Sequence, residues 1–210
     1  MIATDGARGG NFDPEKLAQL RATEATAAAE VLDANLIQLN FPDGELAQSE
    51  EFASRLTAEV VRLKPDLLVA HAPNDYHADH RAVSARALIA ASFRVPVLWV
   101  DPMMGNDFLP NYYVDITPFQ DLKERAILCH NSQRPEHFVE MSRVQGHFRS
   151  AQCGQLGGFA EAFAMIPFTH LQISVLCFPL PLRFSRLLSK ALADADAQKP
   201  VPVFLEKIHR

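Results

Sequence analysis

The chain has 210 residues, 48% of them hydrophobic and 21% charged, which suits one soluble domain with a single core. Lysine and arginine number 20 against 25 aspartate and glutamate, so the formal charge of -5 leaves no basic surplus for phosphates and excludes nucleic-acid binding. The three cysteines lack paired or CxxC spacing, which argues against a disulfide framework and a cysteine-ligated zinc site and favours a cytoplasmic setting.

Apolar and polar runs alternate along the chain in the order typical of βα units. Asp13 followed by Pro14 is a typical N-cap and N1 pair, and the apolar run 67–70 is typical of a parallel strand covered on both faces. Helices are expected at 14–33, 49–63, 79–93, 121–129 and 134–149, and strands at 36–39, 67–70, 95–100 and 113–116. These elements predict an open, mostly parallel, Rossmann-like α/β sheet flanked by helices, with ligands at the carboxyl ends of the strands.

The stretch 162–182 is nearly as apolar as a membrane span and about as long. Its prolines at 167, 179 and 181 each remove a backbone donor and disfavour a continuous helix. A buried strand with its loops, or an oligomer contact, is therefore favoured over a membrane span. Residues 166–210 form a C-terminal extension for which packing on the domain, dimerisation as a homo-oligomer and contact with a membrane surface all stay open.

The loop after the 67–70 strand is unusually rich in side chains that can bind a metal or transfer a proton, with three histidines and two aspartates between positions 71 and 80. His77 and His80 are three residues apart at a loop-to-helix junction, so both can face one side, as a metal site requires. Asp79 between them can accept an N–H from an imidazole and fix its tautomer. The alternative is a solvated helix start in which Asp79 is a cap.

Several short motifs say little when taken one at a time. His130 with Ser132 and Gln133 is compatible with a helix C-cap, and the Thr4-Asp5-Gly6 turn is common. Taken in order along the chain, however, the motifs resemble the LmbE/PIG-L family over residues 1–165: ATDG at 3–6, RxxE at 21–24, FPDG at 41–44, KPD at 64–66, DxHxDH at 75–80, Asp115-Ile116, Lys123 with HxSQ at 130–133, and EAF at 161–163.

The resemblance implies a zinc-dependent de-N-acetylase that acts on a small-molecule N-acetylglucosamine conjugate, or a related amidase. In that family a zinc ion activates a water molecule for attack on an acetamide carbonyl. By position, His80 is expected to ligate Zn²⁺, His77 to stabilise the oxyanion and protonate the leaving amine, and Asp79 to orient His77 and keep it cationic. Arg21 and Asp43 match sugar-contacting positions.

One family element has no counterpart in these 210 residues. The AHPDDE-type motif, which supplies two zinc ligands and the general base in the family, does not occur, and ATDG ordinarily lies one βα unit further along the chain. We therefore expect an N-terminally truncated α/β domain at 1–165 with weak or no activity. His71, Asp75 and His130 are candidate substitute ligands.

Two other functions remain as alternatives to the hydrolase. A catalytically dead protein of this fold would bind a sugar or a partner without zinc-dependent chemistry. An unrelated phosphohydrolase is disfavoured, because the sequence has neither a glycine-rich phosphate loop nor a second acidic pair.

Overall fold

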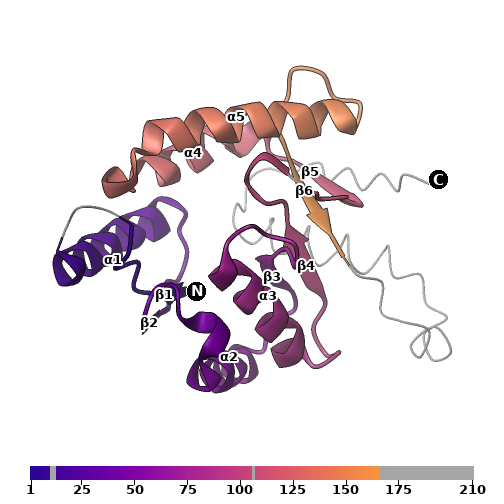
Figure 1. The fold of residues 1–210 in the computed structure, drawn as a ribbon. Coiled ribbons are helices and arrows are strands. Elements are labelled where there is room, and N and C mark those ends of the chain that lie inside the picture. Colours follow the sequence, from indigo (N-terminus) through magenta and orange to yellow (C-terminus); the bar gives the residue numbers. More distant parts are fainter. Residues whose placement is uncertain (10–12, 106, 166–210) are drawn as a thin grey trace, which may run out of the picture.

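The structure is a computed structural model that describes residues 1–9, 13–105 and 107–165, and every structural statement below concerns these residues. Its strands are β1 (Ile2–Thr4), β2 (Gln38–Phe41), β3 (Leu68–His71), β4 (Val97–Val100), β5 (Tyr112–Asp115) and β6 (Ala160–Ala164). Its α-helices are α1 (Pro14–Val31), α2 (Glu50–Leu63), α3 (Ala78–Ala91), α4 (Gln120–Leu128) and α5 (Pro135–Gln152). Figure 1 shows α2 and α3 grouped at one side of the strands and α4 and α5 at another.

The strands form two groups. β1 and β2 pair in parallel, and a four-stranded sheet has the order β3-β4-β6-β5. In that sheet β3 and β4 are parallel, with His71 opposite Val100, whereas β6 runs antiparallel to both of its neighbours. The expected α/β fold with a mostly parallel strand arrangement is confirmed. Strand β6 overlaps the start of the stretch 162–182, for which a buried strand was one expectation, and its antiparallel pairing departs from a purely parallel order.

Helix positions follow the predictions closely because the local signals are strong. Asp13 caps α1 by accepting the Lys16 N–H at 3.1 Å, and Ser49 caps α2 by accepting the Phe52 N–H at 3.0 Å. At the other end of α2, Lys64 adopts a left-handed conformation. Helix α5 extends to Gln152, three residues beyond its expected end.

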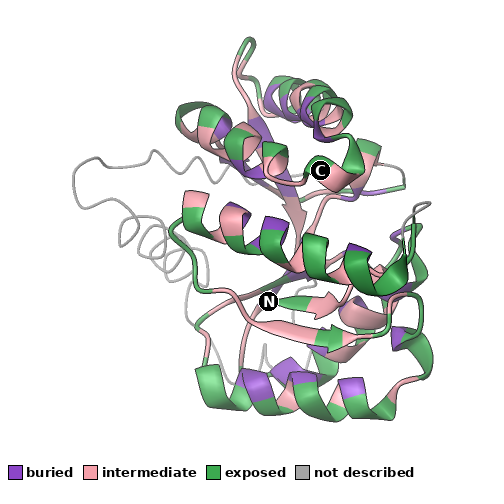
Figure 2. Cartoon of the chain, turned by 90° about the vertical axis from the view of Figure 1, so that its left-hand side faces the viewer, coloured by how far each residue is buried: buried purple, intermediate pink, exposed green. Residues whose placement is uncertain are grey.

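Two buried clusters hold the layers together. Ala70, Val97, Trp99 and Phe108 of the four-stranded sheet and the following loop pack with Ala87 and Ala91 of α3. The second cluster is built on Phe52, which is fully buried, and it contacts Ala3, Leu39 and Phe41 from one strand pair and Leu68 from the other sheet. Figure 2 shows exposed positions on the outer side of the lowest helix, α2, and buried positions on the side that faces the strands. The Phe52 cluster therefore joins the two sheets into one body.

The apolar stretch 162–182 falls mostly outside the described residues, as does the extension 166–210. Its first residues belong to β6, where Ala162 is buried. In the described part of the chain, every helix is too short or too polar to cross a membrane.

Candidate metal centre

The loop between β3 and α3 is fixed by its own polar side chains. Asp75 Oδ1 accepts the His77 N–H at 2.9 Å, and Arg81 donates from Nη1 to the Asp75 carbonyl at 2.7 Å. His77 is the N-cap of α3, because its Nδ1 accepts the Asp79 N–H at 3.2 Å. The start of α3 therefore positions the histidine-rich segment at the carboxyl end of β3, as the sequence predicts.

Three side chains of this loop converge. Nδ1 of His80 lies 3.0 Å from Asp75 Oδ2, and Nδ1 of His71 lies 4.0 Å from the same oxygen. The imidazoles of His71 and His80 stack with their centroids 3.8 Å apart and their planes 4° from parallel. One ligand atom from each residue falls within 4.8 Å of the other two, so the three form a group that can hold a metal ion.

The chemistry of this group fits zinc. Nδ1 of His80 is buried and, although it is close to Asp75, the contact lacks hydrogen-bond geometry. A buried nitrogen that has no hydrogen-bond partner among the described residues, next to a carboxylate that is 4% exposed, forms a site that a cation would satisfy. Two imidazoles and one carboxylate also match the three-ligand sets of catalytic zinc sites, which leave a fourth position open.

Burial of the His71 imidazole lowers its pKa to about 4, and the neighbouring His80 shifts it in the same direction. The His71 ring is therefore neutral near pH 7. The neutral imidazole is the form that binds a metal ion.

His77 and Asp79 lie next to this group with partners of their own. The exposed His77 ring is 4.7 Å from the His80 ring, and because its Nδ1 accepts a hydrogen bond, the proton of the neutral ring resides on Nε2. The Asp79 carboxylate accepts the N–H groups of Gly44 at 2.6 Å and Leu46 at 3.2 Å. Asp79 thus ties the loop after β2 to the start of α3, and within the described residues its carboxylate accepts no hydrogen bond from His77. Its orienting role stays a prediction.

Arg21 and Asp43, the predicted sugar contacts, both hold the loop after β1. Nη1 of Arg21 donates to the carbonyls of Gly6 and Arg8, the latter at 2.9 Å. Gly6 has φ +66°, and a Cβ there would lie 2.7 Å from Arg21 Cδ, so any larger residue would be strained and would displace the Arg21 side chain. Asp43 Oδ2 accepts the Arg8 N–H at 3.3 Å. These contacts build the loop, and the substrate-binding roles of Arg21 and Asp43 stay predictions.

The HxSQ segment has a different environment. Glu24 is 5% exposed and accepts both the N–H of Ser132 at 2.7 Å and its hydroxyl at 2.8 Å. The RxxE and HxSQ motifs therefore meet across 108 residues of sequence. His130, one of the three candidate substitute ligands, does not belong to the metal-binding group of the described residues.

Sequence reasoning named His80 as a zinc ligand and treated His71 and Asp75 only as substitutes. The structure brings those two to His80. The density of histidine and aspartate between positions 71 and 80 was the signal that pointed to them, but the geometry of the loop decides which of the five side chains converge.

Comparisons with known proteins agree with the motif order. Residues 1–91 match the PIG-L family, GlcNAc-PI de-N-acetylase. A diacetylchitobiose deacetylase from Thermococcus kodakarensis is 28% identical over 196 residues, which cover 82% of this chain and 73% of the relative.

Two solved structures share the fold at 25% identity. N,N'-diacetylchitobiose deacetylase from Pyrococcus horikoshii has a TM-score of 0.67 over 85% of this chain and 74% of its own. GalB, the 4-carboxy-2-hydroxymuconate hydratase from Pseudomonas putida KT2440, has a TM-score of 0.64 over 77% and 78%. With its motifs in family order and deacetylases among its relatives, the chain is similar to the LmbE/PIG-L family.

Proposed function

We propose that this protein is a zinc-dependent deacetylase that hydrolyses the N-acetyl group of an N-acetylglucosamine-type conjugate. The observation that carries the proposal is the convergence of His71, Asp75 and His80 at the carboxyl end of β3. Its relatives support the substrate class, since one is a diacetylchitobiose deacetylase. The fold alone does not decide the reaction, because the hydratase GalB shares it.

His71, Asp75 and His80 would hold the zinc ion. When bound, zinc supplies Lewis-acid polarisation of an amide carbonyl and lowers the pKa of a water molecule. The role of the carboxylate is to balance charge in the site, and the stacked, half-buried His71 and His80 rings limit how far the ligands can move.

His77 would act on the substrate rather than on the metal. Its Nδ1 is occupied by the Asp79 N–H, so Nε2–H is the group left to donate to a developing oxyanion or a leaving amine. A positioned donor of this kind contributes about two to three powers of ten in rate. Asp43, the predicted sugar contact, directly precedes Gly44. Because the Gly44 N–H donates to Asp79 at the start of α3, Asp43 lies near the same end of this helix as His77.

Acetate release tests the proposal directly. The zinc-loaded protein is incubated with diacetylchitobiose and with N-acetylglucosamine, and acetate and free amine are quantified. We expect release that a chelator abolishes, that His80→Ala reduces to background, and that His77→Ala lowers by about two to three powers of ten. The exposed His137 provides a matched control, because His137→Ala removes an imidazole away from the site.

Two results would overturn the proposal. One is acetate release that persists unchanged in His80→Ala after chelation. The other is no release from any N-acetylglucosamine conjugate; sugar-dependent thermal stabilisation without zinc dependence would then favour the catalytically dead sugar-binding protein.

A further inference from the structure

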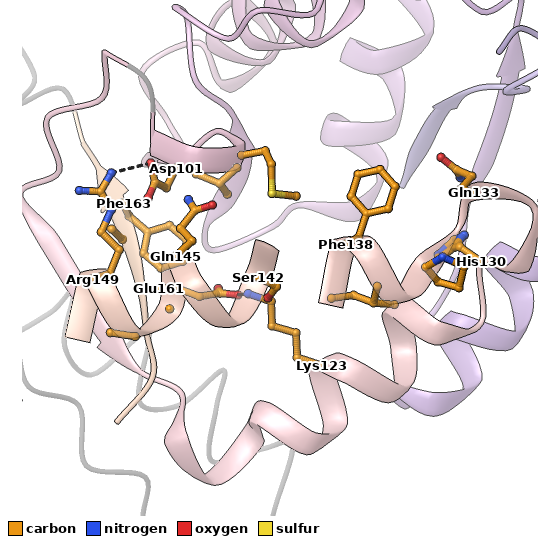
Figure 3. Close-up of a pocket in the computed structure, with 17 residues that line it drawn as sticks. Asp101, Lys123, His130, Gln133, Phe138, Ser142, Gln145, Arg149, Glu161 and Phe163 are labelled. Carbon is orange, nitrogen blue, oxygen red and sulfur yellow. Dashed lines mark hydrogen bonds and ion pairs between the residues drawn. The ribbon is translucent and has the colours of Figure 1, made fainter. Parts of the chain in front are cut away.

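A cavity of about 480 Å³ lies between the four-stranded sheet and the helices α4 and α5 (Figure 3). This volume is in the range of pockets that hold small ligands. Its walls are mostly apolar and come from the end of β4, from β6 and from both helices. The apolar side chains include those of Val100, Met103, Ile127, Phe138, Ala162 and Phe163.

Most polar groups of the cavity already have partners. Arg149, which is 3% exposed, donates to both carboxylate oxygens of Asp101 at 2.6 and 2.9 Å. Gln145 accepts the Met104 N–H at 2.9 Å and donates to the Pro102 carbonyl at 3.0 Å. These groups form one end of the cavity, and most of their hydrogen-bonding capacity is already used within the protein.

The middle of the cavity is different. Ser142 is 6% exposed, and its Oγ is buried without a hydrogen-bond partner in the described residues. Lys123 Nζ lies 2.9 Å from Glu161 Oε1, and both residues line the cavity together with Ser142 (Figure 3). An ammonium has three donors, and a buried hydroxyl without a partner is costly. The apolar walls and these two donor groups therefore favour a ligand that combines an apolar body with an oxygen acceptor.

One wall of the cavity lies on the sheet face toward which His71 points. His71 and Val100 are register partners on the parallel strands β3 and β4. Their neighbours Ala70 and Trp99 pack against α3, so strand alternation turns His71 and Val100 to the opposite face. Val100 is part of the cavity wall, which places this wall one strand away from His71.

We propose that this cavity binds an apolar aglycone, an alkyl or aryl group attached to the N-acetylated amino sugar, while Ser142 and Lys123 donate to the oxygen that links it. The inference rests on the proposed function and names the chemistry of its substrate. A free sugar would leave the walls of Ile127 and Phe138 without an apolar partner, whereas each methylene buried there favours binding.

Calorimetric titration with two glycosides of N-acetylglucosamine tests this assignment. The methyl and hexyl glycosides share the sugar and differ only in the apolar group, and both are titrated into the full chain with and without zinc. We expect the hexyl glycoside to bind at least about tenfold more tightly than the methyl glycoside. Ser142→Leu places a branched side chain in the cavity and should bring the two affinities within about twofold of each other.

A matched control adds the same side chain elsewhere on α5. Val144 is 58% exposed and outside the cavity wall, so Val144→Leu should keep the hexyl preference. Ile127→Phe narrows the cavity from α4 and serves if Ser142→Leu does not fold, as judged by circular dichroism. Equal affinities in the wild type, or a hexyl preference that survives in the folded cavity variants, would overturn the assignment.

The experiment separates this assignment from the proposed function. If the wild type prefers the hexyl glycoside, Ser142→Leu loses that preference and no acetate is released, the aglycone cavity stands and the deacetylase proposal fails. If acetate is released but the hexyl glycoside is not preferred, the deacetylase proposal stands and the aglycone cavity fails.

Discussion

Asp75 and Asp79 have the same side chain, lie four residues apart and are both almost fully buried, yet they face different partners. Asp75 turns its Oδ2 toward the imidazoles of His71 and His80. Asp79 directs both oxygens at backbone N–H groups of the loop after β2. The difference is local, because the N-cap at His77 turns the chain between them.

Asp79 is expected to contribute to stability through the loop that it holds. Asp79→Ala leaves the buried N–H of Leu46 unpaired, and the free energy of unfolding should fall by about 1–3 kcal/mol. Asp79→Asn keeps one acceptor oxygen and should lose less. Urea unfolding of the three proteins measures both effects, and an unchanged stability of Asp79→Ala would show that this contact contributes nothing.

At the scale of the elements, the helices and most strands could be predicted because their signals are local. The caps Asp13 and Ser49 and the apolar run of β3 each depend on a few neighbouring residues. The place of β6 between β4 and β5 could not be identified in this way, because it depends on pairing with residues 45 to 65 positions earlier. The burial of Arg149 against Asp101 also has no local signal.

The carboxylate of Glu24 links helix α1 to Ser132, in the segment between α4 and α5. Glu24→Ala removes both bonds to Ser132 and should lower the free energy of unfolding by about 1–3 kcal/mol, whereas Ser132→Ala removes only the hydroxyl bond and should cost about 0.5–1.5 kcal/mol. Glu30, exposed on the same helix, gives the control Glu30→Ala. Chemical denaturation checks the order, and a larger loss in Ser132→Ala than in Glu24→Ala would contradict it.

At the scale of the whole molecule, the site depends on two sheets kept in place by one core. The sequence predicted the α/β class, but which side chains converge depends on the geometry of the loop between β3 and α3, which Asp79 ties to the loop after β2. His80 could be named from its motif. His71 and Asp75 were only candidate substitutes in the sequence, and their convergence on His80 follows from the folded loop, as the cavity around Ser142 follows from packing.

The Phe52 cluster should make the two sheets unfold together. Phe52→Ala creates a cavity in that cluster and is expected to lower the free energy of unfolding by about 3–5 kcal/mol. Trp99, the single tryptophan, reports on the four-stranded sheet, and far-ultraviolet circular dichroism reports on all elements. Coincident transitions by both probes are expected in the wild type. Separate transitions would show that the sheets are independent.

Zinc affinity tests the metal centre most directly. Titration of the metal-free protein against a fluorescent zinc chelator should give one site in the wild type. His77→Ala should keep that site, because His77 is not one of the three ligands. His71→Ala, Asp75→Asn and His80→Ala should each weaken zinc binding by at least about tenfold, because each removes one ligand of three. A wild type that takes up no zinc, or a His80→Ala variant that binds it as tightly as the wild type, would contradict the account.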